Sequence, residues 1–109
     1  MSLHKVLKKA LEENDVETFL SVFHEDYEFV RHQSGTTMNK AQFSEMVSGM
    51  QTNTGYEELM RRCIYENDDI LVVHSVMRFK DGSRESVIAV NMLENGQVIR
   101  TESGASLMN

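Results

Sequence analysis

Two short turn signals in the second half of the chain constrain the fold more than any other feature. Asp81-Gly82 and Asn95-Gly96 each separate segments that are rich in apolar residues. Such pairs are typical of tight β-hairpins, because both central residues of a type I′ turn need positive φ. The sequence therefore predicts a meandering antiparallel sheet in the C-terminal half, with strands over residues 57–66, 69–79, 84–93 and 97–107.

The N-terminal half has the periodicity of helices instead. A first helix follows the N-cap Ser2, a second follows Asp15, and a third opens at Asn39, with Gln42 in the capping-box position. Residues 27–32 are aromatic and β-branched enough for a strand. The apolar face of the third helix consists of Phe43, Met46, Val47 and Met50, and the polar run 51–55 should end that helix.

Length and composition predict one globular domain. The chain has 109 residues, of which 40% are hydrophobic and 26% charged, values that are ordinary for a folded protein. We therefore expect a single α+β domain over residues 1–109, with the helices on one side of a strongly curved antiparallel sheet.

Charge and hydropathy also exclude some partners. The formal net charge of −6 disfavours binding to nucleic acid phosphates. The longest apolar run, Ile70 to Val73, is far too short to span a membrane, and the N-terminus has no uninterrupted apolar core of a signal peptide. We expect a cytoplasmic protein that binds neither nucleic acid nor membranes.

Metal and cofactor sites have no support in the sequence. Cys63 is the single cysteine, so the chain has neither an internal disulfide nor a thiolate zinc cluster. The histidines lack the spacing of a zinc helix and the acidic residues do not form an EF-hand loop. We expect no metal and no cofactor.

Counting outward from the two turns predicts which side chains share a face of the sheet. With two central residues in each turn, Val73 opposes Val90 and Leu93 opposes Val98. The mainly apolar face, expected to cover the helices, then carries Leu71, Val73, Ser75, Met77, Phe79, Ile88, Val90, Met92, Ile99, Thr101, Ser103 and Ala105. The opposite face carries Val72, His74, Val76, Arg78, Glu85, Val87, Ala89, Asn91, Arg100, Glu102 and Gly104.

This outer face has the composition of an interface between two copies of the chain. It mixes apolar side chains with charges, as the contact between two sheets in a homodimer does. The residues that we expect in that contact are His74, Val76, Val87, Asn91 and Arg100.

Three stretches match a known pattern: ALEENDVETFLSVFHEDYEF over 10–29, MNKAQF over 38–43 and VNMLENGQVIRTES over 90–103. With the order of elements, they resemble the nuclear transport factor 2-like superfamily in its SnoaL-like branch. The resemblance implies a cystatin-like cone, in which a bent sheet wraps around helices, with a pocket at the wide end and pairing through the outer face. Members include isomerases, cyclases, epoxide hydrolases, dehydratases and proteins that only bind, so the resemblance leaves function open.

The steroid isomerase branch can be tested position by position. Its chemistry needs a tyrosine on helix one, a carboxylate on strand one and a protonated aspartate on a later strand. By the resemblance these places fall on Leu7, on Arg31 or His32, and on Ala89, so all three groups are missing. Glu102 and Arg100 could form a pair like that of the epoxide hydrolases, but the counted register points both outward.

Arg31 and His32 are the candidate catalytic residues. They end the first strand, where the cone opens, so one of them should project into the pocket. A histidine can act as a general acid or base near neutral pH, and an arginine can clamp a carboxylate. In the alternative interpretation, one of them pairs with a nearby acid and the other faces water.

The candidate ligand-binding residues lie on the inner face. Tyr27 and Phe29 share one side of the first strand and could line a cavity or belong to an ordinary core. Ser75, Thr101 and Ser103 place hydroxyls on an otherwise apolar face, where a buried hydroxyl needs a partner. Such polar groups in an apolar chamber favour a ligand cavity.

The leading hypothesis is a cone that holds a small apolar or amphipathic molecule. Any catalysis, of the isomerase, cyclase or dehydratase type, would depend on His32 and Arg31. The alternatives are a binding protein without turnover and an association module that uses the outer sheet face.

Overall fold

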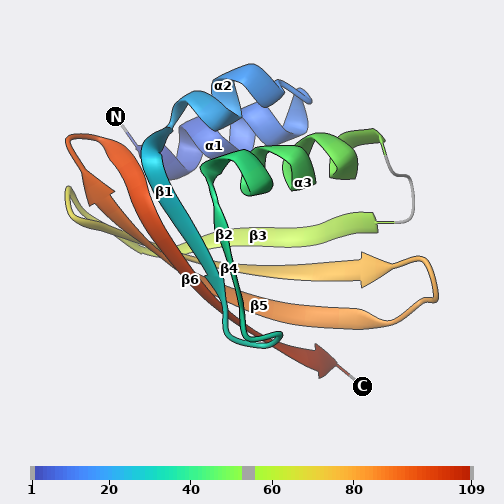
Figure 1. Cartoon of the computed structure of the whole chain (residues 1–109). Helices are drawn as coiled ribbons and strands as arrows, with labels where there is room; N and C mark the ends of the chain where they lie inside the picture. The colour runs from blue at the N-terminus through green and yellow to red at the C-terminus, as the bar shows by residue number, and fades with distance from the viewer. Residues whose placement is uncertain (1, 53–55, 109) are drawn as a thin grey trace.

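The computed structural model describes residues 2–52 and 56–108. This part of the chain forms three helices and one six-stranded sheet. The elements are α1 (Leu3–Glu12), α2 (Val16–Ser21), β1 (Phe23–Arg31), β2 (Thr36–Asn39), α3 (Lys40–Thr52), β3 (Tyr56–Glu66), β4 (Ile70–Phe79), β5 (Arg84–Glu94) and β6 (Gln97–Met108). All three helices lie on one side of the sheet (Figure 1), as an α+β cone requires. No helix in the described ranges has the length and apolarity to cross a membrane.

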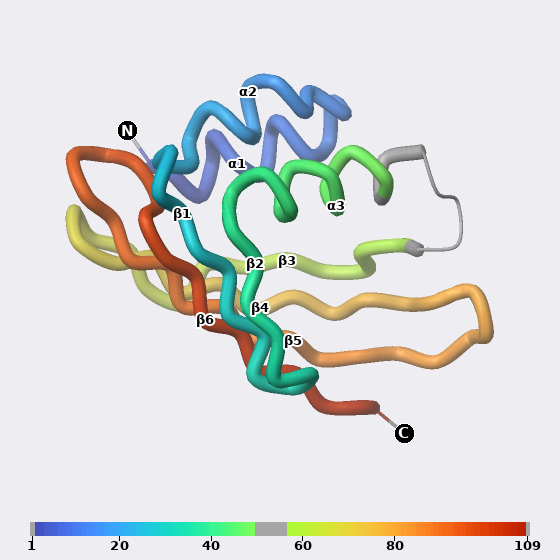
Figure 2. The backbone as a smooth tube through the Cα atoms, in the orientation of Figure 1, coloured from blue at the N-terminus to red at the C-terminus, as the bar shows by residue number. Residues whose placement is uncertain are grey.

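The strands follow the order β2-β1-β6-β5-β4-β3. Neighbouring strands are antiparallel except β1 and β6, which run parallel, so the sheet is mixed where the sequence predicted purely antiparallel pairing. The short strand β2 was not predicted, because its four residues follow a turn and end with the helix cap Asn39 itself. Figure 2 shows β1, β2 and β6 crossing the direction of β3, β4 and β5, which gives the sheet its curvature.

The helix caps are those that the sequence predicted. The Ser2 hydroxyl accepts from the Lys5 amide, and Asp15 accepts from the Thr18 amide at 3.1 Å. Asn39 and Gln42 bond each other's backbone amides, both at 2.9 Å, as a capping box does. The third helix reaches Thr52, while residues 53–55 of the polar run and the side chain of Met50 lie outside the described residues.

The turn at Asn95-Gly96 has the predicted geometry. Both residues have positive φ, 50° and 79°, and Leu93 faces Val98. One residue further, however, a β-bulge between Leu93 and Met92 shifts the register, so that Met92 faces Arg100 rather than Ile99. The bulge changes the pairing along the rest of this strand pair.

The other turn has a different length from the predicted one. Only Gly82 has positive φ, 89°, and the Phe79 amide bonds the Ser83 carbonyl, which leaves residues 80–82 as a three-residue connection. The Asp81 carboxylate stabilises this turn by accepting from the amide and the hydroxyl of Ser83 at 2.9 and 2.6 Å. A two-residue count is therefore wrong by one position here.

The longer turn and the bulge each shift the predicted register by one residue, and such a shift moves every side chain of a strand to the opposite face. Together they leave the predicted faces of β4 and β6 unchanged and reverse those of β5. Ser75 faces Val87, Val73 faces Ala89 and Leu71 faces Asn91. Val87 and Asn91 are thus wrong as residues of the outer face, and so are Ala89 and Glu85: all four line the interior. In their place Ile88, with 46% of its surface exposed, Val90 and Met92 face outward. His74, Val76 and Arg100 lie on the outer face, as predicted.

Candidate functional site

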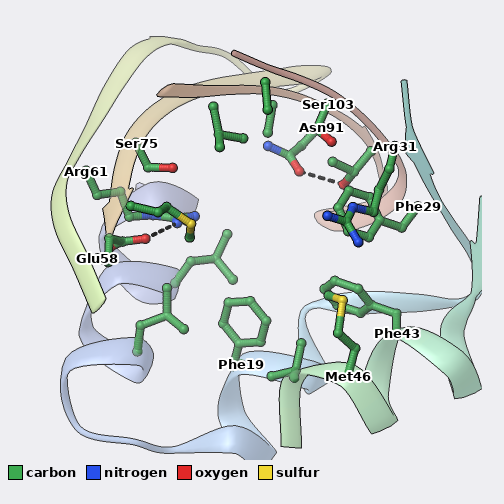
Figure 3. Close-up of a pocket in the computed structure, with 18 of the residues that line it drawn as sticks. Phe19, Phe29, Arg31, Phe43, Met46, Glu58, Arg61, Ser75, Asn91 and Ser103 are labelled. Atoms are coloured by element: carbon green, nitrogen blue, oxygen red, sulfur yellow. Dashed lines mark hydrogen bonds and ion pairs between the residues drawn. The ribbon is translucent and has the colours of Figure 1, made fainter. Parts of the chain in front are cut away.

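A cavity of about 1140 Å³ lies between the inner face of the sheet and the helices. This is slightly above the range of about 300 to 1,000 Å³ that is usual for small-molecule sites. Figure 3 shows the strands arching over this space, with side chains from α2 and α3 below it. This space is partly open to the surroundings rather than fully enclosed.

Aromatic rings close one side of the cavity. Phe43 from α3 lies at the centre of this cluster, with ring centroids 4.9 Å from Phe23, 4.8 Å from Tyr27 and 5.5 Å from Phe29. Phe19 from α2 adds a fifth ring, 5.2 Å from that of Phe23. Tilted and edge-to-face pairs of this kind give the cavity a rigid apolar wall.

A chain of buried hydrogen bonds crosses the roof of the cavity. Thr101 donates its hydroxyl to Asn91 Oδ1 at 2.7 Å, and Asn91 donates its amide to the Leu71 carbonyl at 3.0 Å. The Tyr27 hydroxyl bonds Thr101 at the other end of the chain. Burial raises the pKa of Tyr27, and the bond to Thr101 opposes this only in part, so the phenol is neutral.

Two of the three predicted hydroxyl residues have no such partner. Ser75 and Ser103 are buried, at 6% and 8% exposure, and line the cavity. Within residues 2–52 and 56–108 neither hydroxyl has a hydrogen bond. Thr101 therefore serves the internal network, while Ser75 and Ser103 are available to a ligand or water.

Arg31 projects into the cavity from the end of β1, beside Ser103 on the parallel strand β6 (Figure 3). Its guanidinium forms no hydrogen bond or ion pair with any residue that the structure describes. A cation next to apolar walls needs an anionic or polar partner. The site therefore carries an unused positive charge with a hydroxyl next to it.

A second polar group lies on the opposite side of the cavity. Arg61 Nη1 and Glu58 Oε2 on β3 are 3.2 Å apart, and Arg61 faces Ser75 on β4. In addition, Arg61 Nε is buried without a hydrogen-bond partner among the described residues. Figure 3 shows these three residues across the cavity from Arg31 and Ser103.

His32 does not lie in the cavity with Arg31. It follows β1 on the outer side, where its Nε2 is 2.8 Å from Glu102 Oε1. Glu102 also accepts from Arg100 at 3.2 Å, and Arg100 reaches Glu28 at 3.2 Å. Hydrogen bonds from His32 and then Arg100 hold the pKa of Glu102 below its usual range.

The predicted site residues thus separate into two places. Tyr27, Phe29, Arg31, Ser75, Thr101 and Ser103 line the cavity, whereas His32 joins the outer network. Further polar residues that line the cavity were not predicted, among them Asn91, Glu58, Arg61, Gln33 and Glu85. A signal was available for Asn91, since one polar residue interrupts a run of apolar ones, but the inverted register of β5 placed it outside.

Gln33 and Glu85 add a polar contact at the edge of the cavity. The Gln33 amide donates to Glu85 Oε2 at 3.0 Å. The steroid isomerase positions also reach the cavity, at Leu7, Arg31 and Ala89, and none of them is a tyrosine or a carboxylate. Within the described ranges, no three His, Cys, Asp or Glu side chains gather as metal ligands would.

Solved structures of low sequence identity share this fold. A protein from Kribbella flavida, provisionally assigned as a ketosteroid isomerase, superposes with a TM-score of 0.79 at 16% identity, covering 98% of this chain and 77% of that one. An NTF2-like protein of unknown function from Cytophaga hutchinsonii has a TM-score of 0.73 at 15% identity, with 94% and 96% covered. TerC, co-crystallized with polyporic acid, has a TM-score of 0.67 at 21% identity, with 90% and 84% covered.

Sequence comparison identifies the family. No curated protein matches the chain. The family model of the SnoaL-like domain, in contrast, matches residues 4–102, which is nearly the whole chain. The chain therefore belongs to the SnoaL-like domain family.

Proposed function

We propose that this protein binds a small amphipathic molecule, with its apolar body against the aromatic wall and an anionic group at Arg31. The unpaired guanidinium of Arg31 inside the cavity carries this proposal. A planar guanidinium recognises a carboxylate with two parallel hydrogen bonds, and the neighbouring Ser103 hydroxyl supplies a third donor. TerC, which shares the fold, was co-crystallized with polyporic acid, and the name of that ligand is compatible with an acidic ligand.

Binding without turnover is the form of this function that the geometry favours. His32 is engaged with Glu102 outside the cavity, at 2.8 Å. The acids inside have partners of their own, since Glu58 pairs with Arg61 and Glu85 accepts from Gln33. A general base needs free access to the proton that it removes. Changing His32 to Ala should therefore leave ligand affinity unchanged.

The test uses decanoate, which has an apolar chain and one carboxylate, in isothermal titration calorimetry. Arg31→Met should weaken binding at least tenfold, because a charge-assisted pair contributes about 1.5 to 3 kcal/mol. Arg84→Met is the matched control, since Arg84 is exposed and faces outward beside Arg78. Equal affinities of the two variants, or no decanoate binding by the unmodified protein, would refute the proposal.

We also propose that two copies of the chain pair through the outer face of the sheet. The corrected register places Ile88, Val90 and Met92 there beside Val72 and Val76, and the exposed Ile88 faces Gly104, which has no side chain. A sheet-to-sheet contact would bury this apolar surface.

Light scattering tests the pairing. Ile88→Lys should convert a dimer to a monomer, because it places a charge at the centre of the contact. Ser48→Lys on α3, an exposed position on the other side of the molecule, should leave the dimer intact. A dimeric Ile88→Lys variant would show that another surface is used.

A further inference from the structure

The inner face carries two pairs of arginine and serine, one on each side of the cavity. Arg31 on β1 lies beside Ser103 on β6, and Arg61 on β3 lies opposite Ser75 on β4. All four residues line the cavity, and both serines are buried without a hydrogen bond to the described chain. Figure 3 shows the two groups facing each other across the open space.

The two groups differ in charge. Arg31 has no acidic partner, so its end of the cavity is cationic. Arg61 is paired with Glu58, so the other end is neutral overall and offers hydrogen-bond donors and an acceptor together. A second carboxylate would be repelled by Glu58, whereas a hydroxyl can donate to Glu58 and accept from Arg61 or Ser75.

We infer that the ligand has two polar ends: an acid that binds at Arg31 and Ser103, and a hydroxyl that binds at Glu58, Arg61 and Ser75. This inference rests on the proposed function and specifies its ligand class as an elongated hydroxy acid with an apolar middle. The side chains between the two ends, including Val87 and Ala89 on β5, are apolar and suit that middle.

The spacing of the strands gives the length of the ligand. Ser103 and Ser75 are separated by two strand spacings and a stagger of two residues, because Ser103 faces Ala89 while Ser75 faces Val87. On a flat sheet this corresponds to roughly 12 Å, and the curvature of the sheet brings the two residues closer across the cavity. A chain of ω-hydroxydecanoic acid is long enough to reach from one end of the cavity to the other.

The experiment compares three ligands of equal chain length by titration calorimetry: decanoate, ω-hydroxydecanoate and sebacate. The unmodified protein should bind ω-hydroxydecanoate about tenfold more tightly than decanoate, because the added hydroxyl satisfies buried polar groups. Sebacate should bind more weakly than ω-hydroxydecanoate, since its second carboxylate meets Glu58.

Two variants test the far end of the cavity. Ser75→Ala should lower the tenfold preference to about twofold and leave decanoate affinity unchanged. The double variant Glu58→Met, Arg61→Met removes both charges together, avoids a lone buried ion, and should abolish the preference. The control is Ser106→Ala, at an exposed outer position of β6, which should retain the full preference.

The possible failures are distinguishable. If decanoate binds and depends on Arg31, but ω-hydroxydecanoate binds no better, the proposed function stands and the two-ended ligand is wrong. Tighter binding of sebacate would also overturn the inference, since it would show that the far end is cationic. If decanoate does not bind at all, both proposals fail. If the double variant does not fold, the Ser75→Ala result decides by itself.

Discussion

Two arginines on opposite faces of the sheet differ in their partners. On the outer face, Arg100 has two carboxylate partners, Glu28 and Glu102, each at 3.2 Å. On the inner face, Arg31 has no partner among the described residues, although it is only half exposed. The two arginines project from neighbouring strands of one sheet, β6 and β1.

The outer ion pairs neutralise charges on the surface, whereas the inner arginine keeps a charge that no described residue neutralises. Exposed ion pairs contribute little to stability, typically less than about 1 kcal/mol, but they leave no group unsatisfied. An unpaired cation beside apolar walls gains no ion pair on folding and is available for binding. The comparison therefore assigns the outer arginine to structure and the inner one to recognition.

The largest effect should come from the buried network of the inner face. Thr101→Val removes the hydroxyl that links Tyr27 to Asn91 and leaves both without that partner. The free energy of unfolding should fall by about 1 to 3 kcal/mol in urea denaturation. Thr37→Val, at an exposed position of β2, is the matched control. Similar losses in the two variants would mean that the inner network does not stabilise the fold.

A smaller effect should distinguish the two arginines directly. Arg100→Met should lower the free energy of unfolding by up to about 1 kcal/mol, because both exposed ion pairs are lost. Arg31→Met should leave it within about 0.5 kcal/mol of the original value, since no protein partner is lost. Thermal or urea unfolding without ligand measures both. A larger loss in Arg31→Met than in Arg100→Met would contradict the division of roles.

The smallest expected effect is on the stability of the fold at acidic pH, and it arises at the outer face. The hydrogen bonds from His32 and Arg100 keep the pKa of Glu102 below its ordinary value of 4.5. A group whose pKa is lower in the folded state contributes stability that is present above pH 4.5 and is lost as the pH falls toward the folded value. Glu102→Gln should therefore lessen the dependence of the urea midpoint on pH in this acidic range.

Glu94→Gln, at the exposed end of β5, serves as the comparison for that measurement. It retains the network of His32, Glu102 and Arg100 and should follow the unmodified protein. If Glu102→Gln also follows the unmodified protein, the outer network contributes nothing that depends on pH.

Local sequence signals determined the elements of this protein. The caps at Ser2, Asp15 and Asn39 start helices because each side chain satisfies a backbone amide within its own turn. The Asn95-Gly96 turn likewise forms where two residues accept positive φ. These interactions join residues a few positions apart, so the sequence by itself displays both partners. The α+β class and the inward position of Ser75 and Ser103 follow from such signals, whereas the sequence left open which of Arg31 and His32 faces the cavity.

The tertiary structure decided which face of β5 is inside and which residues meet across the cavity. One turn has three residues instead of two, and a bulge near Met92 shifts the next pairing. Together these two local features reverse the faces of β5 without changing those of β4 and β6. The parallel pairing of β1 with β6 also brought Arg31 to Ser103. Contacts between residues this far apart depend on the whole packed sheet, and no short stretch of sequence contains both partners.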